Sequence, residues 1–139
     1  MQSLKEHVHK ESKLESLDEI QQLEKLIGQL KTLHSEVGQL GKKSPNDGIN
    51  KFKLGMINKV ISRANKFLGE DYTPYDDFDE FIEEDVPSNS DVTFVLLQYL
   101  EEAERYRSNH VDQEMGRYYY KVSGKLTDVR AAPPSWSKK

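Results

Sequence analysis

Apolar residues recur every three or four positions in three long stretches of the chain, which is the spacing of amphipathic helices. In the first stretch, Ser12 and Ser16 each have a Glu three residues later. This is the spacing of a helix capping box, so either serine can begin the helix. Gly41 is of the type that commonly follows a helix C-terminus, and we expect the first helix to end there.

The apolar face of this first helix is wider than the seam of a two-stranded coiled coil. Such a face can contact two neighbours, either other helices of the same chain or a second copy of it. The sequence is therefore compatible with a homo-oligomer formed through this helix. Its three adjacent heptad columns are Ile20, Ile27 and His34; Leu23, Leu30 and Val37; and Leu26, Leu33 and Leu40.

The second stretch predicts a helix from about Ile49 to Leu68, which Gly69 ends. The third opens with a capping signal, Ser88 with Asp91 three residues later, and predicts a helix from Asp91 to about Ser108. We expect Tyr99 and Leu100 to be buried in this third helix. For the second helix, the expected buried positions are Ile49, Phe52, Met56, Val60, Ala64 and Phe67, with Ile57, Ile61 and Leu68 beside them.

The C-terminal part changes to the alternation of β-strands. Residues 117–122 and 125–130 flank the turn pair Ser123-Gly124, which predicts a β-hairpin. A lone hairpin is marginally stable in water, so we expect it to pack on the helices. The predicted fold is therefore mainly α, with three principal helices, an acidic linker and a C-terminal β-hairpin packed on the bundle. Its expected divisions are a flexible N-terminus at 1–11, a single helical domain at 12–130 and an extended tail at 131–139.

The linker, residues 70–91, is rich in carboxylates and is interrupted by Pro74 and Pro87. Its aromatic residues recur every three positions, which predicts a short helix that Thr73 begins as N-cap. We expect the aromatic side chains to anchor the segment while the carboxylates face water. These aromatic residues are Tyr72, Tyr75, Phe78 and Phe81.

The charges are unevenly distributed along the chain. The net charge is −4, but the stretch from Gly69 to Glu104 contains thirteen acidic residues and neither Lys nor Arg. All 20 basic residues therefore lie elsewhere, beside the other 11 of the 24 acidic ones. Such density of like charge destabilises a compact state by repulsion, which suggests that the acidic stretch has a use.

Three interpretations of the acidic linker stay open. It can be a solvated charge run that partly neutralises the second helix, or a docking surface for a basic partner protein. It can also be a nucleic-acid mimic, because a duplex presents one phosphate per ~1.7 Å of its axis. The candidate partner-binding residues are Asp76, Asp77, Phe78, Asp79, Glu80, Phe81, Glu83, Glu84 and Asp85.

Composition excludes several classes of protein. The chain has no cysteine, so it has no disulfide scaffold, no thiolate nucleophile and no Cys-based zinc site. The longest nearly apolar run, Val92–Leu97, is far too short to span a membrane, and the N-terminus lacks the apolar run of a signal peptide. With 35% apolar and 32% charged residues, a small core and much wet surface are expected. We expect a cytoplasmic protein without membrane contact.

The sequence offers little support for catalysis, cofactors or metals. The carboxylates lack calcium-loop spacing, and we expect no metal and no cofactor. His34 lies on an apolar helix face, where a core role is more common than catalysis, and His110 is isolated with Asp112. Tyr118, Tyr119 and Tyr120 lie among basic residues and can in principle stack on bases. We favour a packing role for these tyrosines and expect no direct contact with nucleic acid.

The function that these features favour is stoichiometric binding. We expect a small acidic inhibitor, immunity-type protein or adaptor that docks on a basic protein surface through residues 70–91, without catalytic residues. The alternatives are a nucleic-acid-mimic inhibitor of a DNA- or RNA-binding protein, a homo-oligomeric helical scaffold and, least favoured, a small enzyme.

Overall fold

The structure is a computed structural model, and it describes residues 14–135. The expected flexible N-terminus at 1–11 and the last four positions of the expected tail lie outside this range. The elements are α1 (Leu17–Lys43), α2 (Lys51–Leu68), the 3-10 helix η1 (Glu83–Asp85), α3 (Asn89–Ser108), β1 (Val111–Glu114), β2 (Arg117–Val122) and β3 (Lys125–Arg130).

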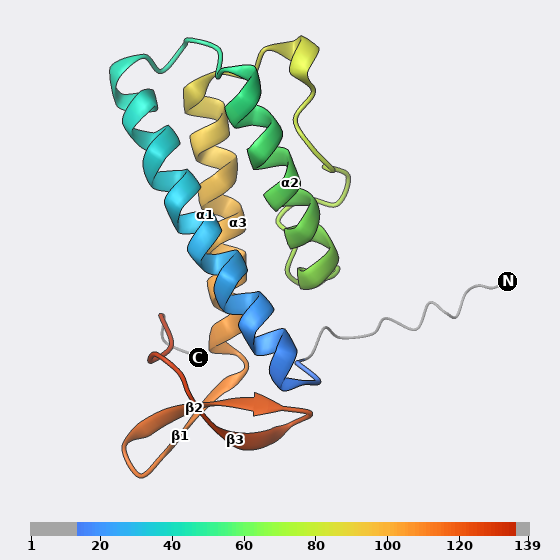
Figure 1. Ribbon diagram of the computed structural model, residues 1–139, viewed down its shortest axis with the longest axis vertical. Helices are drawn as coiled ribbons and strands as arrows, with labels where there is room; N and C mark the ends of the chain where they lie inside the picture. Colours follow the sequence, from blue (N-terminus) through green and yellow to red (C-terminus); the bar gives the residue numbers. More distant parts are fainter. Residues whose placement is uncertain (1–13, 136–139) are drawn as a thin grey trace, which may run out of the picture.

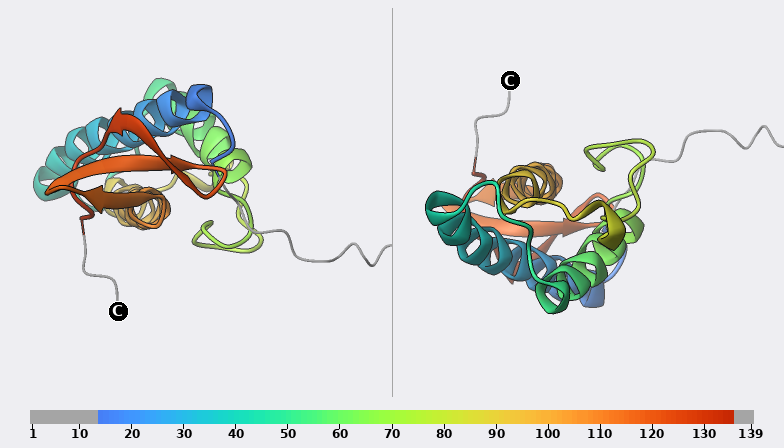
Figure 2. Two further views of the ribbon diagram at one scale, coloured as in Figure 1. Left: turned by 90° about the horizontal axis from the view of Figure 1, so that it is seen from below. Right: turned by 90° about the horizontal axis from the view of Figure 1, so that it is seen from above.

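The three long helices form a bundle, and the sheet covers one of its ends (Figures 1 and 2). The helix α1 runs in one direction, and both α2 and α3 run in the opposite direction. The linker between α2 and α3 therefore travels back along the length of the bundle on the outer side of α2. The mainly α fold with a C-terminal hairpin is confirmed, and one further strand joins the hairpin.

Side-chain caps fix where the helices begin. The hydroxyl of Ser16 accepts a hydrogen bond from the Glu19 N–H at 3.2 Å, so Ser16 is the cap of α1, and the alternative Ser12 lies outside the described residues. The hydroxyl of Ser88 accepts from the Asp91 N–H at 3.1 Å, and α3 begins two residues before the expected start. For α2, the Asn50 carboxamide accepts from the Lys53 N–H at 2.8 Å.

The expected end of the first helix at Gly41 is wrong, because α1 continues to Lys43. A Cβ at Gly41 would lie 3.3 Å from Thr93 Oγ1 and 3.8 Å from the backbone of Asn89. The glycine therefore allows α1 and the start of α3 to approach closely, which is a different use from ending a helix.

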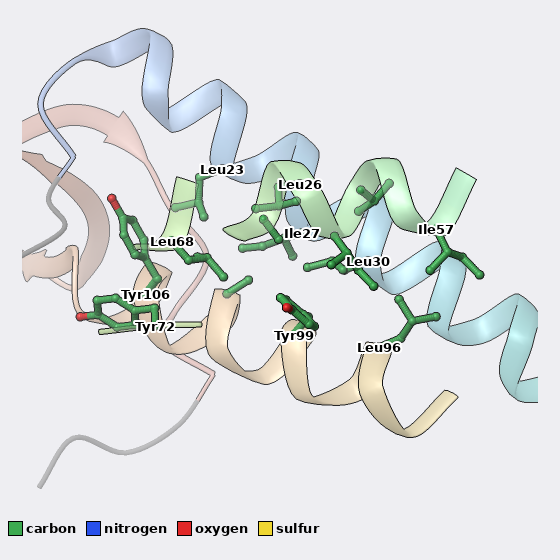
Figure 3. Close-up of a cluster of buried hydrophobic side chains, with 14 of the residues drawn as sticks. Leu23, Leu26, Ile27, Leu30, Ile57, Leu68, Tyr72, Leu96, Tyr99 and Tyr106 are labelled. Atoms are coloured by element: carbon green, nitrogen blue, oxygen red, sulfur yellow. The ribbon is translucent and has the colours of Figure 1, made fainter. Parts of the chain in front are cut away.

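Most of the wide apolar face of α1 is covered within the same chain, by α2, α3 and the sheet, whereas Leu33, His34 and Leu40 stay partly exposed. Figure 3 shows its leucines packed against both other helices, with Tyr99 and Leu96 contributed by α3. Burial of such side chains is the main stabilising term of a small domain. The fully buried large side chains are Leu14, Leu23, Leu30, Val37, Ile57, Ile61, Leu68, Val92, Leu96, Tyr99, Tyr106 and Tyr120.

The predicted stripe of α2 is partly wrong. The side chains of Phe52 and Met56 are 76% and 43% exposed, whereas Leu54 is only 3% exposed. The core positions Leu54, Ile61 and Leu68 recur every seven residues, and this column passes along the side of the helix away from Phe52. Leu100 of α3 is likewise only partly buried, because its neighbour Tyr99 points into the core.

The sheet has three antiparallel strands in the order β1-β2-β3, so the predicted hairpin is the second of two. Two-residue turns join the strands, and both central residues of each have positive φ: Met115-Gly116 and Ser123-Gly124. The Ser123 N–H donates to the carbonyl of Leu14 at 2.8 Å, which ties the sheet to the residues before α1. Tyr120 completes this attachment, since its hydroxyl donates to Glu24 Oε2 at 3.0 Å.

The described part of the tail lies against the C-terminal end of α3. Arg107 is only 7% exposed, and its guanidinium donates to the carbonyls of Ala132 and Pro133, both at 2.9 Å. The same guanidinium pairs with Glu104 at 3.1 Å. Bidentate recognition of carbonyls by a buried arginine fixes the chain direction after the sheet. Among the helices described, none is long and apolar enough to cross a membrane.

Candidate functional site

The acidic linker is held in an extended path by two asparagines of α2. The Asn65 carboxamide donates to the Phe78 carbonyl at 3.2 Å, and the Asn58 carboxamide donates to the Phe81 carbonyl at 3.0 Å. The Phe81 N–H returns a hydrogen bond to Asn58 Oδ1 at 2.9 Å. The linker is thus attached to α2 through its own backbone, by side chains that the sequence reading did not single out.

The predicted short helix beginning at Thr73 is absent, and the helical turn of the linker is η1, at Glu83–Asp85. The spacing of the asparagines explains the difference. Asn58 and Asn65 are seven helical residues apart, or about 10.5 Å along the axis of α2. The three residue steps from Phe78 to Phe81 cover about 10 Å when extended but only about 4.5 Å as a helix. Only an extended linker can reach both asparagines.

The aromatic side chains anchor the linker, as predicted. Tyr72 is 6% exposed, and its ring meets Tyr106 edge-on at 4.9 Å between centroids. Phe78 lies 5.1 Å from Phe81 and 6.4 Å from Tyr99 of α3, so the aromatic cluster bridges the linker and the core. The aromatic residues that recur every three positions are therefore the ones that face the core, although the linker is not helical.

Tyr99 connects this cluster to Asn65. Its hydroxyl donates to Asn65 Oδ1 at 2.8 Å, which leaves the amide nitrogen of Asn65 free to donate to Phe78. Burial raises the pKa of Tyr99 to about 12, partly offset by this hydrogen bond, so the hydroxyl stays a donor at neutral pH. The orientation of the Asn65 amide is thereby fixed.

The carboxylates of the candidate site all face water. Within residues 14–135 this set makes one ion pair, between Glu83 and Lys51, with 3.3 Å between Oε2 and Nζ. Both side chains of that pair are at least half exposed, so it contributes at most about 1 kcal/mol. The seven exposed carboxylates are those of Asp76, Asp77, Asp79, Glu80, Glu83, Glu84 and Asp85.

Apolar side chains lie among these carboxylates at the end of the linker. Ile82 is 50% exposed and Val86 is 64% exposed, on either side of η1. The chain is held immediately after them, because the Ile49 N–H donates to the Pro87 carbonyl at 3.0 Å. The site therefore combines fixed negative charges with two accessible apolar groups.

The other candidates from the sequence have packing roles. The ring of His110 stacks on Tyr106 at 4.5 Å, and its Nδ1 lies 2.7 Å from the Tyr106 carbonyl. Tyr120 is buried under the sheet, and the Arg130 guanidinium lies over the ring of Tyr119, at 5.9 Å, on the other face of β2. Within the described part of the chain, no group of three or more His, Asp or Glu could hold a metal ion.

Comparisons with known proteins add no family. No protein-family model matches the chain, and no curated protein or solved structure matches it.

Proposed function

We propose that this protein binds a basic surface of another protein through residues 70–91, without catalysing a reaction. In this proposal it is a stoichiometric inhibitor, immunity-type protein or adaptor that acts in the cytoplasm. The observation that carries the proposal is the attachment of the linker: its carboxylates are exposed, while Asn58, Asn65 and the aromatic cluster hold its backbone.

Holding the backbone matters because binding normally costs the entropy of ordering flexible groups. A linker whose backbone is already bonded to α2 presents its carboxylates with less of that cost. Ile82 and Val86 would add apolar contact beside the charges, and such desolvated groups mainly slow dissociation. The carboxylates themselves would mainly accelerate encounter with a basic surface.

The competing interpretation is that the linker only neutralises α2. One exposed ion pair, Lys51 with Glu83, joins the candidate carboxylates to α2 in the described range. The remaining six carboxylates repel one another without such compensation, which favours a use outside this chain. Most of the wide face of α1 is covered within the chain, which favours docking through the linker over a scaffold assembled through α1.

The test begins with identification of a partner by capture from the native host. Association is then measured at several salt concentrations for the wild type and for a variant with Asp76, Asp77 and Asp79 changed to Asn and Glu80 changed to Gln. We expect the variant to lose at least about tenfold in association rate and to show a shallower salt dependence. Its stability should be equal or higher, because repulsion falls.

A matched control removes the same charge elsewhere. It changes four exposed carboxylates outside the linker, Glu36, Asp47, Glu114 and Asp128, to their amides. We expect its association rate to stay close to that of the wild type. Equal rates and equal salt slopes for the linker variant and the wild type would refute the proposal. Duplex DNA that competes for the same site on the partner would identify the nucleic-acid-mimic form of binding.

A further inference from the structure

A cleft of about 530 Å³ opens between α1 and α2, at the end of the bundle that the sheet covers. Its floor is apolar and is formed by Leu26, Phe67 and Tyr106. Its rim carries three cationic side chains, Lys25, Arg63 and Lys66. The volume lies within the range of about 300–1,000 Å³ that is typical of small-molecule sites. The cleft shares no residue with the acidic linker.

The cations of the rim are available to a ligand. Within residues 14–135, neither Lys25 nor Lys66 forms an ion pair, and both side chains are exposed. Nη1 of Arg63 donates to Gln29 Oε1 at 2.6 Å, and the other N–H groups of the guanidinium can donate to a ligand. Glu19, the one carboxylate of the lining, already accepts from the Glu15 N–H at 2.7 Å. The lining therefore has an excess of positive charge.

Tyr106 supplies a second, independent observation. Its side chain is 2% exposed and its ring lies 5.3 Å from Phe67, yet its hydroxyl has no hydrogen-bond partner among the residues described. Figure 3 shows this hydroxyl directed away from the aliphatic side chains of the core. Glu19, which also lines the cleft, is near enough to act on its titration.

A buried hydroxyl without a partner is unusual in a folded protein. Burial, with the nearby charge of Glu19, raises the pKa of Tyr106, so the hydroxyl stays protonated and has a proton to donate to a ligand oxygen. An acceptor oxygen placed in the cleft would satisfy it. The anion that carries this oxygen would be attracted by the three cations of the rim, whose charge exceeds that of Glu19 in the lining.

We propose that this cleft binds a small organic anion with an apolar body, such as a medium-chain carboxylate. The body would cover Leu26 and Phe67, and the anionic head would lie between the rim cations with an oxygen accepting from Tyr106. This site would be occupied independently of any protein bound at the acidic linker.

The test uses 8-anilinonaphthalene-1-sulfonate, an aromatic anion whose fluorescence rises in apolar sites, titrated against the full chain. We expect one saturable site from which laurate displaces the probe. Inorganic phosphate, which has no apolar body, should not displace it at equal concentration. Lys66→Glu and Arg63→Glu should each weaken probe binding by about tenfold or more, since each replaces attraction by repulsion. Lys59→Glu, an exposed position of α2 outside the cleft, should change it by less than about twofold.

Tyr106→Phe tests the hydroxyl separately, because it keeps the ring that closes the floor. We expect weaker probe binding in a protein that is as stable as the wild type or more stable. Binding at many equivalent sites, equal effects of Lys59→Glu and Lys66→Glu, or displacement by phosphate as effective as by laurate would each overturn the proposal. Circular dichroism of each variant confirms that a lost signal does not reflect a lost fold.

Discussion

Asn58 and Phe81 exchange two hydrogen bonds, one in each direction, between the carboxamide of the first and the backbone of the second. A carboxamide has the same donor and acceptor as a peptide group, so Asn58 satisfies the linker backbone as a neighbouring β-strand would. Both the N–H and the C=O of Phe81 are thereby paired at a half-buried position, where unpaired groups are costly.

Asn58→Ala should release the linker at Phe81. We expect a loss of about 1–3 kcal/mol in the free energy of unfolding, because two backbone groups lose their partners together. Urea denaturation measures the loss, and hydrogen exchange should show faster exchange of the Phe81 amide. Asn46→Ala, at an exposed turn position, is the control and should change neither quantity. Unchanged exchange at Phe81 in the Asn58 variant would mean that other contacts hold the linker.

The two leucines of α3 should differ in cost. Leu96 is fully buried, so Leu96→Ala should reduce the free energy of unfolding by about 2–5 kcal/mol. Leu100 is only partly buried, and Leu100→Ala should cost less than about 2 kcal/mol. Denaturant midpoints of the two variants provide the comparison. If Leu100→Ala reduced the free energy of unfolding more than Leu96→Ala, the buried face of α3 would contain Leu100 and not Leu96, and the prediction would be wrong.

Stability should fall in alkaline solution as Tyr99 ionises. The folded pKa of Tyr99 is raised from 10.0 to about 12, so between these values the native state holds a proton that the unfolded state loses. The stability that the protonated Tyr99 hydroxyl contributes is therefore fully present below pH 10 and is lost as the pH rises to 12. The free energy of unfolding falls by about 2–3 kcal/mol over this interval. The stability difference between wild type and Tyr99→Phe should shrink over this interval. A difference that stays constant from pH 9 to 12 would contradict the assignment.

Val86 has a left-handed backbone conformation that asparagine adopts more easily than valine. Its φ is 49° and its ψ is 63°, the left-handed region that β-branched residues rarely adopt. Val86→Asn should therefore raise the free energy of unfolding by about 1 kcal/mol, since the exposed valine loses little burial. Ile82→Asn is the matched control: Ile82 is exposed but has a φ of −92°, and no gain is expected there. Thermal unfolding measures the melting temperature of both variants. Equal shifts in melting temperature would mean that the backbone conformation of Val86 does not cause the gain.

The periodic parts of this fold were predictable from the sequence, and the exceptions have local causes. Apolar residues at helical spacing, with capping serines for two of the helices, predicted three helices close to their observed bounds, because each signal acts within one or two turns. The strand β1 was missed because Asp112, Gln113 and Glu114 are all polar and exposed, so only Val111 carries an inward-facing side chain. Its pairing with β2 depends on the turn at Met115-Gly116, and no alternation of apolar and polar residues before this turn indicated a strand.

The candidate site was predictable in composition but not in construction. Exposed carboxylates and inward aromatic residues follow from their chemistry alone. The extended path depends on Asn58 and Asn65, which lie in another element and bond to backbone groups, so local spacing in the linker could not reveal it. Two half-buried asparagines seven residues apart on α2 were the available signal. The α1–α2 cleft was equally hidden, because its lining comes from three helices.

The order of the elements also has a consequence for synthesis. The helix α1 contacts α3 more extensively than α2, and the residues before α1 receive a hydrogen bond from Ser123. A ribosome therefore exposes the apolar face of α1 long before the chain that covers it exists. At about 5–20 residues per second, synthesis from the end of α1 at Lys43 to the end of α3 at Ser108 takes several seconds. During that time the nascent chain has an uncovered face, which closes only when α3 has been made and the sheet can bond to the residues before α1.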